Sequence, residues 1–122
     1  MLAASALFTS LASAPALGAH AITKEASATV TLAPGETRTV TVGYPDALEY
    51  GNASYSGRTV VLGPAPGAPG RQPRRSAVAV LGASSALGGS DYRVRVRNRN
   101  PSGTAPERVR VIAITIEPLP HS

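Results

Sequence analysis

The stretch that decides the fold lies in the last third of the chain, where residues 92–97 read Tyr92-Arg93-Val94-Arg95-Val96-Arg97. Valine and arginine alternate strictly here, and a period of two is typical of a β-strand with one buried and one solvated face. Residues 108–116 form the longest β-run of the chain, and the prolines that follow it cannot donate to a strand ladder. We therefore predict two strands here, separated by a turn region at 98–106.

The same pattern continues toward the N-terminus in shorter runs. β-branched and apolar residues alternate or cluster at 28–32, 39–42, 59–62 and 77–81, and turn compositions separate these runs. Several short strands with regularly spaced turns are typical of a sandwich or a barrel. No helical periodicity occurs after residue 21. The sequence predicts an all-β, antiparallel β-sandwich of about six to seven strands.

Length and composition limit the function classes. The chain has 122 residues, a net charge of +5 and no cysteine, which fits one domain and excludes disulfides, thiolate metal sites and a cysteine nucleophile. Residues 1–21 carry no charge and end in Ala19-His20-Ala21, a composition that predicts a secretory signal peptide. A retained membrane anchor and a disordered N-terminus are the alternatives. The expected mature chain, residues 22–122, is a single domain without a transmembrane span, secreted or associated with the cell envelope.

Three segments resemble an immunoglobulin-like β-sandwich. The first, Leu32-Ala33-Pro34-Gly35-Glu36-Thr37, looks like the first hairpin of such modules. The second, Leu87 followed by Tyr92, is similar to the segment where a tyrosine enters the sixth strand and caps the preceding corner. The third, 94–98 with its turn and the run from Val109, resembles the terminal hairpin. The resemblance is closest to the small fibronectin type III-like modules of bacterial exported proteins.

The residues themselves argue against an enzyme. A nucleophile needs a base held within hydrogen-bond reach, and the two histidines lie at 20 and 121, in the predicted leader and next to the C-terminus. The seven acids lie mostly at turns or strand ends, where we expect them to be solvated. Asp46, Glu49 and Asn52 supply too few oxygens for a calcium loop. We predict no cofactor and no metal.

An arginine stripe is the strongest candidate site. Side chains alternate across a strand, so Arg93, Arg95, Arg97 and Arg99 share one face. If 91–99 and 107–117 form a hairpin with facing valines, Arg108 and Arg110 join that face, with Arg95 opposite Arg110. Such opposed like charges destabilise a strand pair unless an anionic partner relieves them. The alternative is a solvated face whose arginine stems cover apolar surface. The lack of Trp, and of Phe after residue 21, makes nucleic acid the weaker candidate partner.

Two further segments leave alternatives open. In 109–116, valines occupy one parity and Ile112, Ile114 and Ile116 the other, which predicts a β-bulge near Val111-Ile112 or an apolar patch for weak self-association. Residues 63–75 are so rich in Pro and Gly that we expect a mobile loop or linker.

These observations predict an exported structural or interaction module at the cell surface. Its partner would be an acidic cell-envelope polymer or protein. The alternative is a secreted inhibitor or partner of an extracellular enzyme that presents residues 63–75 as an exposed loop.

Overall fold

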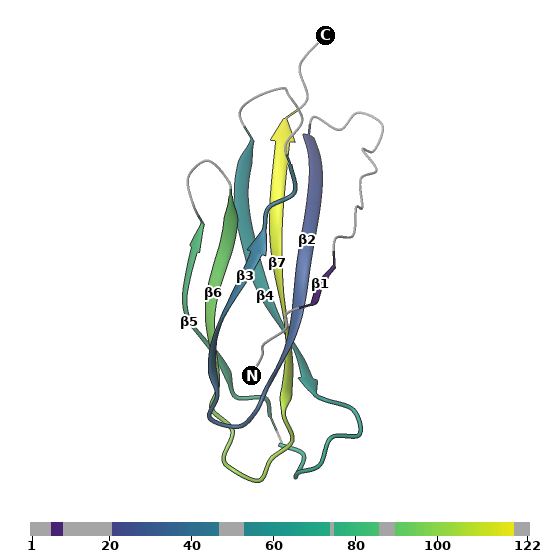
Figure 1. The fold of residues 1–122 in the computed structure, drawn as a ribbon, viewed down its shortest axis with the longest axis vertical. Helices are drawn as coiled ribbons and strands as arrows, with labels where there is room; N and C mark the ends of the chain where they lie inside the picture. Colours follow the sequence, from purple (N-terminus) through teal and green to yellow (C-terminus); the bar gives the residue numbers. More distant parts are fainter. Residues whose placement is uncertain (1–5, 9–20, 47–52, 74, 86–89, 119–122) are drawn as a thin grey trace.

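The computed structural model describes residues 6–8, 21–46, 53–73, 75–85 and 90–118. In these ranges the chain forms strands and no helix, which confirms the predicted all-β class (Figure 1). The strands are β1 (Ala6–Phe8), β2 (Ala21–Leu32), β3 (Thr37–Gly43), β4 (Ser54–Pro64), β5 (Val78–Ser85), β6 (Asp91–Asn98) and β7 (Glu107–Pro118).

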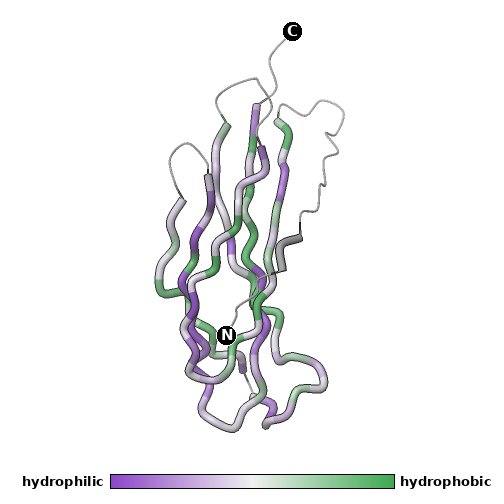
Figure 2. The backbone as a smooth tube through the Cα atoms, in the orientation of Figure 1, coloured by the Kyte–Doolittle hydropathy of each residue, from purple (hydrophilic) through white to green (hydrophobic). Residues whose placement is uncertain are grey.

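The strands form two antiparallel sheets that enclose one core. The four-stranded sheet has the order β1-β2-β7-β4, and the three-stranded sheet has the order β3-β6-β5. Buried residues of both sheets make up a single apolar cluster, so the architecture is a β-sandwich. Figure 2 shows hydrophobic segments along β7 and hydrophilic segments along β6.

Most of the predicted leader lies outside the described residues, and its cleavage stays a prediction. Within it the structure describes β1, which pairs with Ser27–Thr29 at the edge of the four-stranded sheet, and Ala21 at the start of β2. Because β1 contacts its sheet only through the edge of β2, its removal would leave the order β2-β7-β4 intact.

The strand pairing is nested. β2 pairs with β7 along its whole length, from Ala21 opposite Pro118 to Leu32 opposite Glu107. β3 pairs with β6 in the other sheet. The first long strand of the described chain thus lies beside the last, and the second beside the second last.

Both hairpins expected from the immunoglobulin resemblance are wrong. β6 and β7 lie in different sheets, so the segments 91–99 and 107–117 do not pair. The turn at 33–36 forms as predicted, with Gly35 at φ 82° and the Glu36 N–H donating to the Ala33 carbonyl at 3.0 Å. It connects β2 to β3 across the two layers, however, and therefore makes a sheet-to-sheet crossing.

The predicted bulge in the last strand is also wrong. β7 keeps one continuous register with β2, and its odd-numbered residues from Glu107 to Glu117 are all buried. The register shifts lie instead in the edge strands, at Leu62 of β4 and Leu81 of β5. β5 continues past its bulge to Ser85, so 82–85, expected to be a connection, is strand.

The tyrosines fill a space that small residues leave open. Ala26, Ala113 and Gly57 lie side by side in the four-stranded sheet, and the Tyr92 ring from the other sheet packs onto Gly57. Tyr44 packs edge-on against Tyr55 with ring centroids 5.1 Å apart, and its hydroxyl hydrogen-bonds Ser85. These three tyrosines belong to the core or its border. Tyr50 and Leu87 lie outside the described residues.

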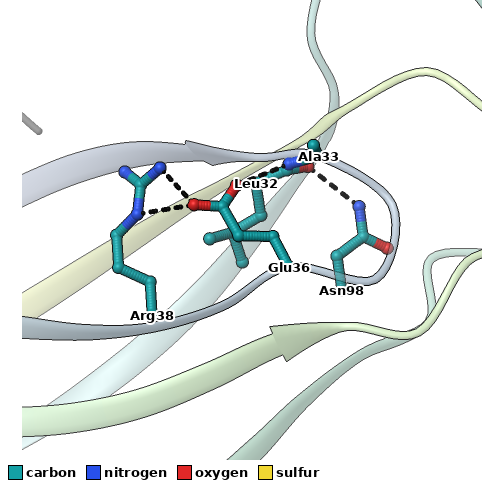
Figure 3. Close-up of polar contacts among 5 residues, drawn as sticks. All are labelled: Leu32, Ala33, Glu36, Arg38 and Asn98. Atoms are coloured by element: carbon teal, nitrogen blue, oxygen red, sulfur yellow. Dashed lines mark hydrogen bonds and ion pairs between the residues drawn. The ribbon is translucent and has the colours of Figure 1, made fainter. Parts of the chain in front are cut away.

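A buried polar network joins the sheets where β6 ends. Asn98 Nδ2 donates to the Leu32 carbonyl at 2.9 Å (Figure 3). The Asn100 N–H donates to Asn98 Oδ1 at 2.9 Å. Asn100 Nδ2 in turn donates to Glu107 at 3.0 Å, and the Ser76 hydroxyl donates to the second Glu107 oxygen at 2.8 Å. Asn98 and Glu107 are fully buried, so the expectation of a solvated acid is wrong for Glu107. It is also wrong for Glu117, which is 2% exposed.

The Pro- and Gly-rich segment 63–75 packs against the β6–β7 connection. The Arg71 N–H donates to the Gly103 carbonyl at 2.8 Å, and the Ala105 N–H donates back to Arg71 at 2.9 Å. Gly70 has φ 121° and lies so close to Thr104 and Ala105 that a Cβ would clash with their backbone. Gly63 and Pro64 belong to the end of β4, and the described residues that follow form a loop docked on this connection, which corrects the expectation of a mobile loop or linker.

Replacing Gly57 by Ala should destabilise the sandwich. The new Cβ would lie 2.5 Å from Tyr92 Cζ, and the ring is held in the core. We expect a loss of about 1–3 kcal/mol in the free energy of unfolding, measured by urea denaturation. Gly82→Ala is the control, because a Cβ there meets no atom within 4 Å. Equal effects at the two positions would contradict the assigned packing.

Asn98→Ala should also destabilise the protein. The change leaves the Leu32 carbonyl and the Asn100 N–H without their buried partner, which costs about 1–3 kcal/mol. Arg99→Ala, at the exposed neighbouring position, should change stability by less than about 0.5 kcal/mol in the same denaturation measurement. A small effect at Asn98 would show that the network does not hold the sheets together.

Stability should fall at alkaline pH because of Tyr92. Burial, with a smaller contribution from Tyr44, raises the pKa of Tyr92 above its ordinary value. The unfolded chain then loses the phenolic proton at a lower pH than the folded chain. The contribution of neutral Tyr92 to the free energy of unfolding is therefore fully present below about pH 10, and it is lost as the pH rises further. The melting temperature of Tyr92→Phe should decline less between about pH 9 and 11 than that of the unchanged protein. Parallel declines would contradict this assignment.

Candidate anion-binding face

Three arginines form a column on the outer face of the three-stranded sheet. Arg93, Arg95 and Arg97 alternate along β6 with Val94 and Val96, which are fully buried. All three arginines are exposed, so the predicted shared face is confirmed for them. Arg99 follows the end of β6 and is exposed as well. We call Arg93, Arg95 and Arg97 the arginine column.

Arg108 and Arg110 do not belong to this column, which corrects the prediction of six arginines on one face. They lie in β7, whose inward residues face the core from the other sheet, so their side chains point away on the opposite side of the sandwich. Arg110 is exposed. Arg108 is half-buried, and its Nε is a buried donor without a hydrogen-bond partner among the described residues.

Small uncharged residues flank the column on both sides. The arginines lie opposite threonines in β3, with Arg95 opposite Thr39. On the β5 side, Arg95 lies opposite Gly82. The predicted pairs of opposed arginines across a hairpin therefore do not occur. The full set of flanking residues is Thr37, Thr39 and Thr41 in β3, and Ala79, Gly82 and Ser84 in β5.

The short flanks leave a hollow beside the guanidinium groups. A depression of about 350 Å³ is lined by Arg93, Arg95, Thr39, Gly82 and Ser84, together with Ala83 and Val94. A second one of about 250 Å³ adjoins it at Ser90 and Asp91. Threonine and serine hydroxyls and arginine N–H groups are all donors, so the first hollow is equipped to receive an anionic group, whereas the second also contains the Asp91 carboxylate.

The column has little internal charge compensation. In the part of the chain that the structure describes, its one ion pair joins Arg93 Nε to Asp91 at 3.4 Å. Glu36 is engaged elsewhere, since it accepts from Arg38 at 2.5 Å and from the Ala33 N–H (Figure 3). Arg95 and Arg97 thus present uncompensated positive charge.

The other side of the sandwich carries the isoleucines. With β7 in continuous register, Ile112, Ile114 and Ile116 take outward positions, which was the alternative to a bulge. Ile112 is buried, and the other two are half-buried. Self-association through them stays a prediction.

A second hollow region lies at the end of the sandwich beneath the docked loop. A depression of about 490 Å³ lies between the loop and the β6–β7 connection, with Arg71, Arg75, Ser76, Asn100 and Thr104 among its lining residues.

The sequence does not reveal the buried network of Asn98, Asn100 and Glu107, because asparagine and glutamate near a Pro-Ser-Gly turn have the composition of solvated turn residues.

Metal-binding groups do not gather in the described part of the chain. No three His, Cys, Asp or Glu residues lie together there. Asp46 is exposed, and the Glu49 and Asn52 that would complete the weighed calcium loop lie outside the described residues.

None of the described residues belongs to a helix that is long and apolar enough to cross a membrane. The chain matches no protein-family model, no curated protein and no solved structure.

Proposed function

We propose that the protein is a non-enzymatic interaction module that binds an anionic partner through the arginine column. The observation that carries the proposal is the exposure of Arg93, Arg95 and Arg97 on one central strand between flanks of small, uncharged residues. A solvated face needs no hollow between its charges, whereas this face has one beside Arg93 and Arg95.

The spacing of the column favours a linear partner. Successive outward residues of a strand are about 6.7 Å apart, so three guanidinium groups meet charges repeated at a similar distance. Each guanidinium can donate two parallel hydrogen bonds to a carboxylate or phosphate. Nucleic acid is the weaker candidate polyanion, because no Trp and only tyrosines after residue 21 are available for base stacking.

A catalytic function is not proposed because the sequence has no histidine between residues 20 and 121. Export and a cell-surface location rest on the composition of residues 1–21 alone. We do not extend the proposal to the immunoglobulin class, since β6 and β7 lie in different sheets.

The docked loop supports a second candidate function, that of an inhibitor or partner of an extracellular enzyme. A loop held in one conformation before it binds loses less conformational entropy on binding, which favours inhibition. The hydrogen bonds of Arg71 to the β6–β7 connection hold this loop in that way. Under this alternative, the binding residues would be those of 63–75 and not the arginine column.

Polyanion binding tests the main proposal. We expect the full chain to bind inorganic polyphosphate with a strong salt dependence, and Arg95→Ser/Arg97→Ser to lower the slope of log K against log salt by roughly 1.5. Arg58→Ser/Arg110→Ser removes the same charge from exposed positions of the other sheet and should change the slope much less. Equal losses in the two double variants would mean that net charge alone drives binding, and the proposal would fail.

A further inference from the structure

One side of the sandwich is open. Val61 in β4 and Val80 in β5 occupy inward positions, opposite Val109 and Val96, which are fully buried. Yet Val61 is 39% exposed and Val80 is 52% exposed. On the β2–β3 side, the inward residues are all buried: Val30 and Leu32 in β2, and Val40 and Val42 in β3. The apolar core is therefore covered on one side and reaches solvent on the other.

The open side is bounded by the free edges of the two sheets. β4 ends the four-stranded sheet and β5 ends the three-stranded sheet. The two edges approach each other where Ser85 Oγ lies 3.5 Å from the Tyr55 carbonyl oxygen. In Figure 1, β5 forms one lateral margin of the molecule.

β5 lacks the side chains that usually protect an edge strand. Free edges in soluble proteins carry lysine or proline, or inward-pointing charges, which discourage pairing with another strand. β5 reads Val78-Ala79-Val80-Leu81-Gly82-Ala83-Ser84-Ser85, without a charge or a proline, and it is exposed from Val80 onward. Its one protective device is the bulge at Leu81, which is itself 41% exposed. This edge is therefore suited to accept a further strand.

The arginine column indicates what such a strand must carry. A strand added to β5 would lie about 4.8 Å from β5 and about 9.6 Å from β6. β5 would lie between the added strand and β6, and its outward residues are Ala79, Gly82 and Ser84. A Cβ at Gly82 would meet no atom within 4 Å. Arginine and glutamate side chains can meet over residues this small. The added strand would thus place acids on its outer face, and on its inner face it would place aliphatic residues that cover Val80 and Val61.

We propose that β5 accepts an extended segment of a partner protein, in which acidic and aliphatic residues alternate, as a fourth strand of the three-stranded sheet. This inference rests on the proposed function and names its partner class. A second copy of the chain fits less well, because its β5 carries no acid to compensate the arginines. A phosphate polymer has neither the backbone N–H groups to pair with β5 nor the apolar groups to cover the valines.

Synthetic octapeptides test the inference on the full chain. A capped peptide of alternating Glu and Val should bind at least tenfold more tightly than a peptide of the same composition with all glutamates in one half. Methylating the backbone nitrogens of either all Glu or all Val residues removes the donors of one strand edge. One of these two methylated peptides should lose binding, because only one edge faces β5.

A matched pair of variants locates the site. Gly82 and Thr39 lie opposite Arg95 on its two sides, so Gly82→Glu and Thr39→Glu add the same charge beside the same arginine. We expect Gly82→Glu to lower the affinity for the alternating peptide at least tenfold, and Thr39→Glu to lower it less than threefold. Circular dichroism confirms that both variants fold.

The outcomes separate the inference from the proposed function. If both methylated peptides, or the segregated peptide, bind as tightly as the alternating one, strand addition is refuted. If Gly82→Glu and Thr39→Glu act equally, the site is not β5. If polyphosphate binding still depends on Arg95 and Arg97 in either case, the proposed function stands and only the peptide partner is wrong.

Discussion

A buried amide, that of Asn98, ties the two layers of the sandwich together. It donates to the Leu32 carbonyl in the opposite sheet and accepts from the Asn100 backbone, so that two polar groups which burial would leave without partners are satisfied. Asn100 passes the connection on to the buried carboxyl group of Glu107. Asn98 closes β6 and Glu107 opens β7, and the chain between these two buried residues crosses from one sheet to the other.

That crossing determines where the arginines go. Had β6 and β7 formed a hairpin, their outward arginines would have opposed one another in one sheet. Since the chain crosses, Arg108 and Arg110 lie on one outer surface and Arg93, Arg95 and Arg97 on the other. The column consequently has threonines, glycine and serine as neighbours, and its charges are separated along the strand and not across it. The crossing between the sheets thus shapes the charge pattern of the surface.

The sequence predicts which side chains face inward much better than it predicts which strands are partners. Alternation in 92–97 correctly buries Val94 and Val96, because the period of a strand depends on local geometry. Pairing depends on where connections go, and here the decisive residues, Asn98 and Glu107, have the composition of a turn. The bulges escaped prediction for a similar reason: they lie in the edge strands, at Leu62 and Leu81, where no change of apolar parity reveals them. The Pro- and Gly-rich composition of 63–75 predicts a mobile loop or linker. In the structure, Gly70 lets the backbone of this segment approach Thr104 so closely that any side chain at position 70 would clash.

Nested pairing also sets the order in which this chain can fold. β7 is an inner strand of the four-stranded sheet, yet among the described strands it follows both of the strands that it joins. Until β7 has been synthesised, β2 and β4 lack the neighbour that lies between them. Contacts between such distant segments slow folding to the range of milliseconds to seconds. Deletion of β7 therefore removes an inner strand of the sheet and leaves β2 and β4 with no ladder between them.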